Sequence, residues 1–556
     1  MNTQHKKRYR FPIACRSPLA WLLFVSAIFM SFLFSISGDD NYINLAIPFA
    51  IPFCAYLFLI KGIHIAPLRV LNRKLLWFSV IVSLFAQSFF GRKFYDWIYY
   101  RIQTACANYG FETLTEPLRR ATTVLVTLFS FPAVCFFFYI AYRELLRFAK
   151  TLNEGFGKTE KRIFVSFSLF FSVLIIIVYS LTCVFFAAYF RNGLLYDIVY
   201  SSDSTALYYT NAFLNVGDAE NDLRQPLFGV FSAPFSIIPY AISLILSAIP
   251  LFSFIPNLYA YLLAIEQAML LLLSFLLIVD LLDLRGAEKV LSCAIFAFSF
   301  PSLLFSLNLE QYIFAVFWLV LYIYATHKRL RGSDHLWLCA TGSLLTSALL
   351  LPLSYRRERT LTENALNFTK IILLFVALCF AFGRGAYLVG VIDQIRKMFT
   401  WAGGGIPLIQ RLYQYSAFIS SCLVYPDTHI INETIQQVPP LGFDFAGIAL
   451  FVLAVIGFVI NRKQPFAQIS FAWLCFSFIM LVVIGWGSKE NGMVLYSLYF
   501  AWALISLIVG SITAIPKRWS PVRIALLSLA LIPLLYFNAR GFMAIMDFAI
   551  TYYPMV

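Results

Sequence analysis

Charged residues are scarce in this chain: Asp, Glu, Lys and Arg make up only 12% of its 556 residues. A soluble domain carries about 25%, so this chain lacks the polar surface that a body in water requires. Hydrophobic residues reach 61%, and the mean hydropathy is +0.80. Helices satisfy their own backbone hydrogen bonds in lipid. The composition therefore excludes a soluble fold and predicts an all-α polytopic membrane protein.

Metal and phosphate motifs of the familiar kinds are missing as well. The ten cysteines form no CxxC pair, and the five histidines are dispersed, which argues against a zinc site. Acidic residues are outnumbered, 27 against 42 basic ones. The basic residues lie in short loops between apolar runs, where they orient a membrane protein. We therefore expect a lipid bilayer as the partner and no nucleic acid.

Apolar runs long enough to cross a bilayer, about 17–25 residues, recur along the whole chain. The basic N-terminus is predicted to be cytoplasmic by the positive-inside rule. Alternation from there places the C-terminus outside, in a plasma (inner) membrane protein. We count about thirteen crossings, near 19–37, 43–60, 75–90, 121–142, 163–190, 257–283, 290–307, 311–326, 369–383, 445–461, 466–486, 492–514 and 521–538.

Two further apolar stretches conflict with this charge alternation. If 226–255 crossed the membrane, the basic loops at 285–289 and 327–331 would both lie outside. The four prolines within it and Pro256 just after it favour broken helices instead, so we predict a juxtamembrane helix or a re-entrant helix pair. The run 336–353 lies between two basic loops, and we predict two half-length helices that turn back near Gly342 or Pro352.

These spans divide the chain into four regions. Residues 1–162 form an N-terminal four-helix extension with a basic cytoplasmic loop, and 163–383 form a core whose first outer loop is 191–256. A second outer segment, 384–444, precedes a C-terminal four-helix region, 445–556. The two outer segments are long enough to build a site, and polar groups at the bilayer edge usually carry function.

Three elements in the core are candidates for a functional site. Asp203 and Ser204 precede a stretch with Tyr208 and Tyr209, the sequence RQPLF occupies 224–228, and Glu310 follows a Phe-Pro step at 300–301. Each has a structural alternative. Asp203 is a good helix N-cap, Glu310 could cap or pair, and an arginine near a membrane edge such as Arg224 often anchors at headgroups.

The order of these elements resembles the GT-C superfamily of membrane glycosyltransferases, such as protein O-mannosyltransferases and lipid A aminoarabinose transferases. Those enzymes have an Asp in the first outer loop, then a Tyr-rich helix and a His/Lys-Pro-Pro-Leu-Tyr-like step. The chain departs from the second pattern, with Arg224 for His/Lys and Gln225 for the first Pro. Glu310 fits the place of the family's second acidic residue. The resemblance covers about 163–400.

The resemblance implies a sugar donor linked to polyprenyl phosphate and an acceptor on the outer face of the membrane. Asp203 would be the catalytic general base, and cations would offset the charge of the leaving phosphate. Of the outer basic residues we favour Arg224 and Arg384, which lie closest to predicted helix ends. The family often holds a divalent metal ion. Here only Asp203 and Glu310 are candidates for one, so the cofactor stays unknown.

Two other functions remain open. A glycan polymerase or ligase for lipid-linked sugars also has many spans and one or two large outer loops. A flippase or transporter would have ionisable residues in mid-span and inverted repeats. The sequence shows no clear repeat and no chain of mid-span charges, which favours the enzyme.

Overall fold

The computed structural model describes residues 72–555, except for 109, 188, 192–193, 197, 215–223, 331, 383, 385–387, 389–390, 401, 404, 439–440 and 490–491. The expected crossings near 19–37 and 43–60 lie outside the described residues. The chain forms two compact units. The first comprises Met1–Leu152 with Ile372–Val389, and the second Asn153–Ile371 with Gly390–Val556.

Two long helices make up most of the described part of the first unit. They are α3 (Arg73–Asn108) and α4 (Thr115–Gly155), joined by a turn and the short helix η4 (Glu112–Leu114). They run antiparallel, because the Phe78 and Tyr142 rings pack 5.1 Å apart. The expected crossings 75–90 and 121–142 lie inside these helices. The expected outer loop 91–120 is instead mostly helix, and from residue 91 to Pro117 it contains no helix-breaking proline.

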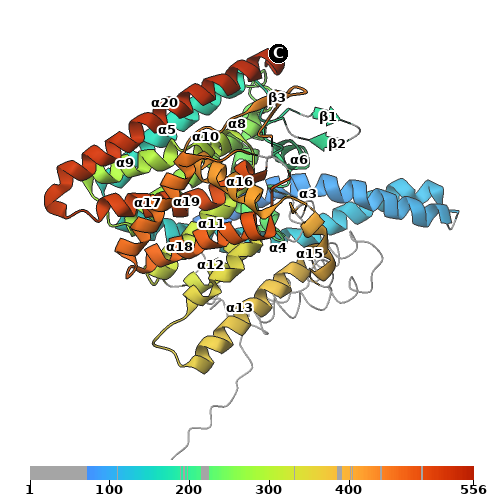
Figure 1. Ribbon diagram of the computed structural model, residues 1–556. Coiled ribbons are helices and arrows are strands. Elements are labelled where there is room, and N and C mark those ends of the chain that lie inside the picture. Colours follow the sequence, from blue (N-terminus) through green and yellow to red (C-terminus); the bar gives the residue numbers. More distant parts are fainter. Residues whose placement is uncertain are drawn as a thin grey trace, which may run out of the picture. The chain divides into compact units, whose positions relative to one another are not determined.

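The second unit carries the remaining elements, most of which are helices (Figure 1). Its first half contains α5 (Lys158–Leu181), β1 (Tyr189–Arg191), β2 (Leu194–Tyr196), α6 (Ser204–Tyr209), α7 (Phe228–Ser247), α8 (Leu258–Leu281), α9 (Gly286–Ala297), α10 (Phe300–Leu307), α11 (Tyr312–His327), α12 (Ser333–Ser343), the 3₁₀ helix η5 (Leu345–Ser354) and the start of α13 (Leu361–Ala381). Its second half contains α15 (Val391–Thr400), α16 (Leu408–Ser421), β3 (His429–Ile431), β4 (Thr434–Gln436), α17 (Phe445–Asn461), α18 (Pro465–Phe478), the π-helix η6 (Ile479–Ile484), α19 (Gly492–Thr513), η7 (Lys517–Trp519) and α20 (Ser520–Tyr552).

Within the described residues, seven helices are long and apolar enough to cross a membrane. The count is eight if α9 and α10 form one span, bent by 61° just before Pro301. The chain is therefore a mostly helical membrane protein, as its composition predicts. The expected number of thirteen crossings is not confirmed, and α7, which we did not count as a crossing, is among the seven. Two short antiparallel hairpins, β1–β2 and β3–β4, were not expected.

Ion pairs gather at one end of the second unit, which we call the ionic end. It contains the start of α5, α9 and α20 and the last residues of α8 and α11. Buried Arg523 bonds Glu288 at 3.1 Å, and its guanidinium also donates to the carbonyl of Ile515. Lys289 pairs with Glu160. The other pairs there are Lys328–Asp280, Arg329–Glu358, Arg356–Asp334, Arg359–Asp334, Lys517–Asp283 and Arg285–Asp283.

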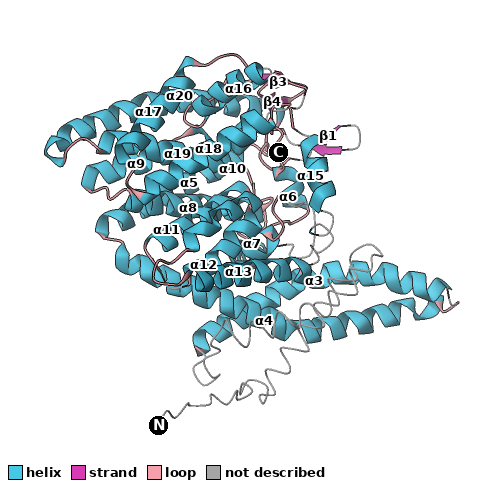
Figure 2. Ribbon diagram, turned by 60° about the horizontal axis from the view of Figure 1, so that its bottom comes forward, coloured by secondary structure: helices cyan, strands magenta, loops and turns pink. Residues whose placement is uncertain are grey.

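The opposite end of the unit, which we call the loop end, carries the small hairpins and the last residues of the chain (Figure 2). Thr182, just after α5, forms a β-bridge with Pro554, and Val199 forms one with Ile435. Buried Asn538 of α20 donates to the carbonyls of Phe298 and Leu423, so one amide satisfies the break before α10. The loop end therefore holds its irregular backbone by specific hydrogen bonds.

The α12–η5 hairpin begins and finishes at the ionic end. Arg356, after η5, reaches Asp334 in the first turn of α12. The two helices meet at Leu344, whose extended backbone breaks the helix. This break lies next to Gly342, one of the two positions where we expected the chain to turn. The geometry is that of a segment that returns to the side from which it came.

The expectation for 226–255 is corrected in part. The prolines at 234 and 239 lie inside α7, which is one continuous helix and not a pair. Its aromatic side chains contact the beginnings of other helices: Phe228 packs on Phe314 in α11, and Tyr240 packs on Tyr259 in α8. α8 and α11 both begin at the loop end. These contacts favour a helix that stays near that end.

The second outer segment is also more regular than expected, because much of 384–444 is helical. α16 has both of its ends at the loop end. Arg411 near its start donates to the carbonyls of Val482 and Val483, and Cys422 after its end contacts the carbonyl of Ser497. α16 packs closely on α17, where a Cβ added at Gly447 would overlap the Ser416 carbonyl.

The Arg523–Glu288 pair predicts a stability effect with a clear sign. Both side chains are less than 10% exposed. The variant Arg523→Met would leave Glu288 buried without its cation, at a cost of about 3–5 kcal/mol. The double variant Arg523→Met/Glu288→Met should recover most of this loss. Thermal unfolding of the purified protein in detergent measures both, and equal midpoints for the two variants would contradict the pairing argument.

Candidate functional site

The predicted residues Asp203 and Glu310 come together at the loop end. The backbone N–H of Asp203 donates to Oε1 of Glu310 at 2.6 Å. The other carboxylate oxygen, Oε2, accepts the N–H of Gln311 at 3.3 Å. Glu310 is fully buried, whereas Asp203 is exposed. Glu310 therefore holds the Asp203 loop in place across 107 positions of sequence.

The backbone before Asp203 is strained. Tyr200 and Ser201 both have positive φ, near +53° and +52°, which is unusual for residues other than glycine. Strand β4 fixes this loop, because Tyr200 N–H donates to the carbonyl of Ile435 and Ile435 N–H donates to that of Ile198, each at 2.8 Å. Strain of this kind concentrates at functional sites.

Asp203 occupies the N-cap position of α6, but its side chain makes no capping bond to the helix. Capping, the structural alternative for this residue, thus does not engage the carboxylate. Buried Ser202 and Ser204 flank it, and Ser202 accepts a hydrogen bond from Asn308 at 3.3 Å. Asn308 also precedes Glu310 by two positions, so a second contact ties the two loops together.

Arg224 is linked to the Asp203–Glu310 pair through Tyr496, and we call these residues the cluster. Its guanidinium donates to the hydroxyl of Tyr496 in α19, and the same hydroxyl lies within electrostatic range of Asp203. Tyr312, two residues after Glu310, interacts electrostatically with both Asp203 and Glu310. The site therefore brings together the Asp203, Arg224 and Glu310 segments that the sequence analysis singled out separately.

Tyrosines form the buried wall of this cluster. Tyr312 and Tyr499 pack edge to face at 4.9 Å, and Tyr496 lies 6.4 Å from each of them. The Gln225 amide donates to the Tyr499 hydroxyl at 2.8 Å. Sequence reasoning missed Tyr496 and Tyr499, which lie in the C-terminal region where we expected no site residues. Their spacing of three places both on one face of α19.

Tyr208 in α6 forms another part of the wall. Its ring stacks on Tyr259, and its hydroxyl donates to Asn257 at 3.4 Å. Burial, assisted by the neighbouring Tyr209, raises the pKa of Tyr208 to about 12. The hydroxyl is therefore protonated throughout the physiological range and offers a neutral donor, not a base.

Arg384, the second phosphate-binding candidate, is buried in the first unit. Asp203 belongs to the second unit, so the role of Arg384 stays a prediction. The other basic candidates have local tasks. Arg411 satisfies three backbone carbonyls, those of Ile406, Val482 and Val483, and Arg396 pairs with Asp393 on exposed α15.

A divalent ion does not fit the observed arrangement well. Both oxygens of Glu310 accept backbone N–H groups, which uses much of the acceptor capacity that an ion would require. Among the described residues, no three His, Cys, Asp or Glu side chains gather as a metal site would require.

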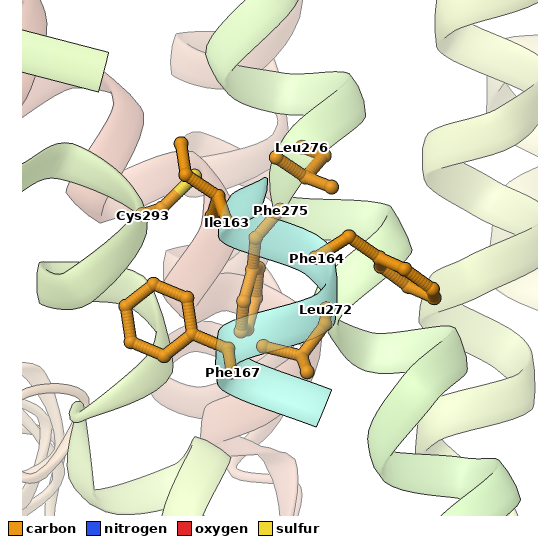
Figure 3. Close-up of a pocket in the computed structure, with 7 residues that line it drawn as sticks. All are labelled: Ile163, Phe164, Phe167, Leu272, Phe275, Leu276 and Cys293. Atoms are coloured by element: carbon orange, nitrogen blue, oxygen red, sulfur yellow. The ribbon is translucent and has the colours of Figure 1, made fainter. Parts of the chain in front are cut away.

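A separate hollow lies between α5, α8 and α9, nearer to the ionic end (Figure 3). It is lined by Ile163, Phe164, Phe167, Leu272, Phe275, Leu276 and Cys293. Apart from one thiol the lining is apolar and offers no acid or base for catalysis.

The hydrogen bond to Asp203 gives a testable prediction. Glu310→Ala removes the acceptor and leaves a backbone N–H unpaired, which should lower the free energy of unfolding by about 1–3 kcal/mol. Glu310→Gln keeps one acceptor oxygen and should lose less. Hydrogen exchange of the 200–204 peptide should quicken in the same order. Exposed Glu358→Ala is the control, and unchanged exchange in Glu310→Ala would refute the clamp.

Comparison with known proteins adds no family to this description. No protein-family model, curated protein or solved structure matches the chain. The geometry of the site and the order of its motifs along the chain are therefore the observations that bear on function.

Proposed function

We propose that this protein is a membrane glycosyltransferase of the GT-C type. It would transfer a sugar from a polyprenyl-phosphate-linked donor to an acceptor on the outer face of the membrane, in assembly or modification of cell-envelope glycans. The observation that carries the proposal is the hydrogen bond between Asp203 and Glu310. It joins the first-loop acid to the second acid in the order that the resemblance implies.

In this proposal Asp203 is the general base. Its exposed carboxylate accepts the proton of the acceptor hydroxyl as that oxygen bonds to the anomeric carbon of the sugar. The bond from this carbon to the phosphate oxygen breaks, and the electron pair leaves with the phosphate. Arg224 offsets the charge that develops there. Glu310 is a positioning residue, because it acts on the loop and not on the substrate.

The proposal also assigns the two ends of the second unit to the two sides of the membrane. Basic residues concentrate at the ionic end, which therefore faces the cytoplasm by the positive-inside rule. Asp203 and the C-terminus, which share the loop end, then face outward. The α12–η5 hairpin enters the membrane from the cytoplasmic side and returns, and the plasma (inner) membrane is the expected location.

A second candidate, a flippase for lipid-linked sugars, is favoured by one observation. Glu266 lies within α8, and its Oε2 is buried without a hydrogen-bond partner among the described residues. A carboxylate inside a span often marks an ion or substrate path. The break between α12 and η5 also fits a transporter, because transporters contain broken helices buried in protein at membrane depth.

Asp203→Asn tests the enzyme. Sugar transfer from a polyprenyl-linked donor in reconstituted vesicles should fall by a factor of about 10² or more, as expected on loss of a general base. Asp427→Asn, a change of an exposed acid at the same end, should leave transfer unchanged.

Two outcomes decide against the proposal. Wild-type transfer by Asp203→Asn would exclude this residue as the base. Translocation of the lipid-linked sugar without transfer, by the wild type and the variant alike, would identify the flippase instead. Insertion is checked in both by protease accessibility of the loops.

A further inference from the structure

The tip of the α12–η5 hairpin is fixed against the segment that carries Arg224. Leu345 N–H donates to the Arg224 carbonyl at 2.8 Å, and Leu227 N–H donates to the Gly342 carbonyl at 2.9 Å. A Cβ at Gly342 would lie 2.5 Å from the Phe231 ring and 2.9 Å from Leu227. The hairpin and the Arg224 segment are therefore in direct backbone contact.

Three hydroxyl groups of this tip have no hydrogen-bond partners among the described residues. They belong to Thr341, Ser343 and Ser347, and each of these residues is fully buried. Helical Ser and Thr usually bond a carbonyl of the preceding turn, as Ser79 and Ser83 do here. Buried polar groups that lack partners cost free energy. Three such hydroxyls at one tip therefore indicate that a bound molecule accepts their hydrogen bonds.

The charge at the tip favours an anion as that partner. Residues 341–347 and 224–228 contain no acidic residue, and Arg224 is the single charged one. The two oxygens of Glu310 already accept backbone N–H groups. The hydroxyls lie on a segment in backbone contact with Arg224. Hydroxyl and guanidinium donors both match the oxygens of a phosphate group, whereas a cation would need carboxylate ligands.

Gln225 adds a possible donor to the set. Its Oε1 is buried without a partner among the described residues, while its amide nitrogen donates to Tyr499. Rotation of this amide by half a turn exchanges the two atoms. Oε1 would then accept from the Tyr499 hydroxyl, and the NH₂ group would take the position that Oε1 now occupies.

We propose that the hairpin tip, with Arg224 and Gln225, binds a phosphate ester. Thr341, Ser343 and Ser347 donate to its oxygens, and Arg224 supplies the charge. The inference rests on the proposed function, in which a lipid-linked phosphate is the leaving group. It adds a location to that function: the phosphate lies against a hairpin that no sequence motif assigns to the site.

Binding of the full chain in lipid nanodiscs tests the site. The probe is a polyprenyl monophosphate, its affinity is measured by titration, and no acceptor is present. Thr341→Val, Ser343→Ala and Ser347→Ala should each weaken binding about tenfold, the loss typical of one hydrogen bond to a charged group. Thr341→Ser keeps the hydroxyl and should bind as the wild type does.

The matched controls are Ser470→Ala and Ser477→Ala. Both serines are buried in α18, away from the tip. The Ser470 hydroxyl has no hydrogen-bond partner among the described residues, and Ser477 lies beside Tyr415. Both control variants should bind the probe with the affinity of the wild type. The neutral polyprenol should bind at least tenfold more weakly than the phosphate. Competition by inorganic phosphate would show that the site takes free phosphate as well, and its absence would show that the lipid chain is required.

Unchanged affinity in all three tip variants would overturn the proposal, because the hydroxyls would then hold water alone. Equal binding of polyprenol and polyprenyl phosphate would overturn it too. The assay also separates the two proposals. A protein that loses phosphate binding in the tip variants but transfers no sugar refutes the glycosyltransferase and keeps the site. A protein that transfers sugar, and whose tip variants bind the phosphate probe with unchanged affinity, refutes the phosphate site and keeps the glycosyltransferase.

Discussion

Charged side chains cannot cross the lipid cheaply, and the second unit of this protein is arranged accordingly. Nearly all of its described ion pairs lie at one end, where Arg523, Lys289 and Lys328 find carboxylates on neighbouring helices. A segment whose two ends both carry such pairs must return to that end. The α12–η5 hairpin does so, and its turn then lies deep in the helix bundle, against the backbone of Arg224.

The site depends on this arrangement, because its parts come from five distant segments. The Asp203 loop, the Arg224 segment, the Glu310 turn, the hairpin tip and the start of α19 meet at or below the loop end. Each joint is a backbone or buried side-chain hydrogen bond, as between Asp203 and Glu310 or between Gln225 and Tyr499. Such bonds are costly to leave unmade in a buried place, so they fix the loops more firmly than surface contacts would.

Sequence reasoning reached the helical membrane fold, because hydropathy and charge alternation act locally and leave a visible pattern. It singled out Asp203 and Glu310 through the resemblance of their surroundings to family motifs. Charge alternation also predicted a turn near Gly342 or Pro352, and the break at Leu344 lies next to the first of these. Sequence reasoning did not find the helical course of 91–120 or of 384–444, since polar residues there resemble loops. Tyr496 and Tyr499 were also missed. They gain their meaning only from α19 packing beside Arg224, which no local pattern encodes.

The structure distinguishes the surroundings of Glu310 from those of Asp203. A carboxylate that accepts two backbone N–H groups has much of its hydrogen-bonding capacity in use. Glu310 is therefore better suited to hold a loop than to hold a substrate or an ion. Asp203 is exposed, makes no capping bond and follows two strained residues. A single general base must be accessible to the substrate and held in a fixed position, because a base acts only within hydrogen-bond reach of the proton that it removes. An exposed Asp203 on a loop fixed by Glu310 meets both requirements.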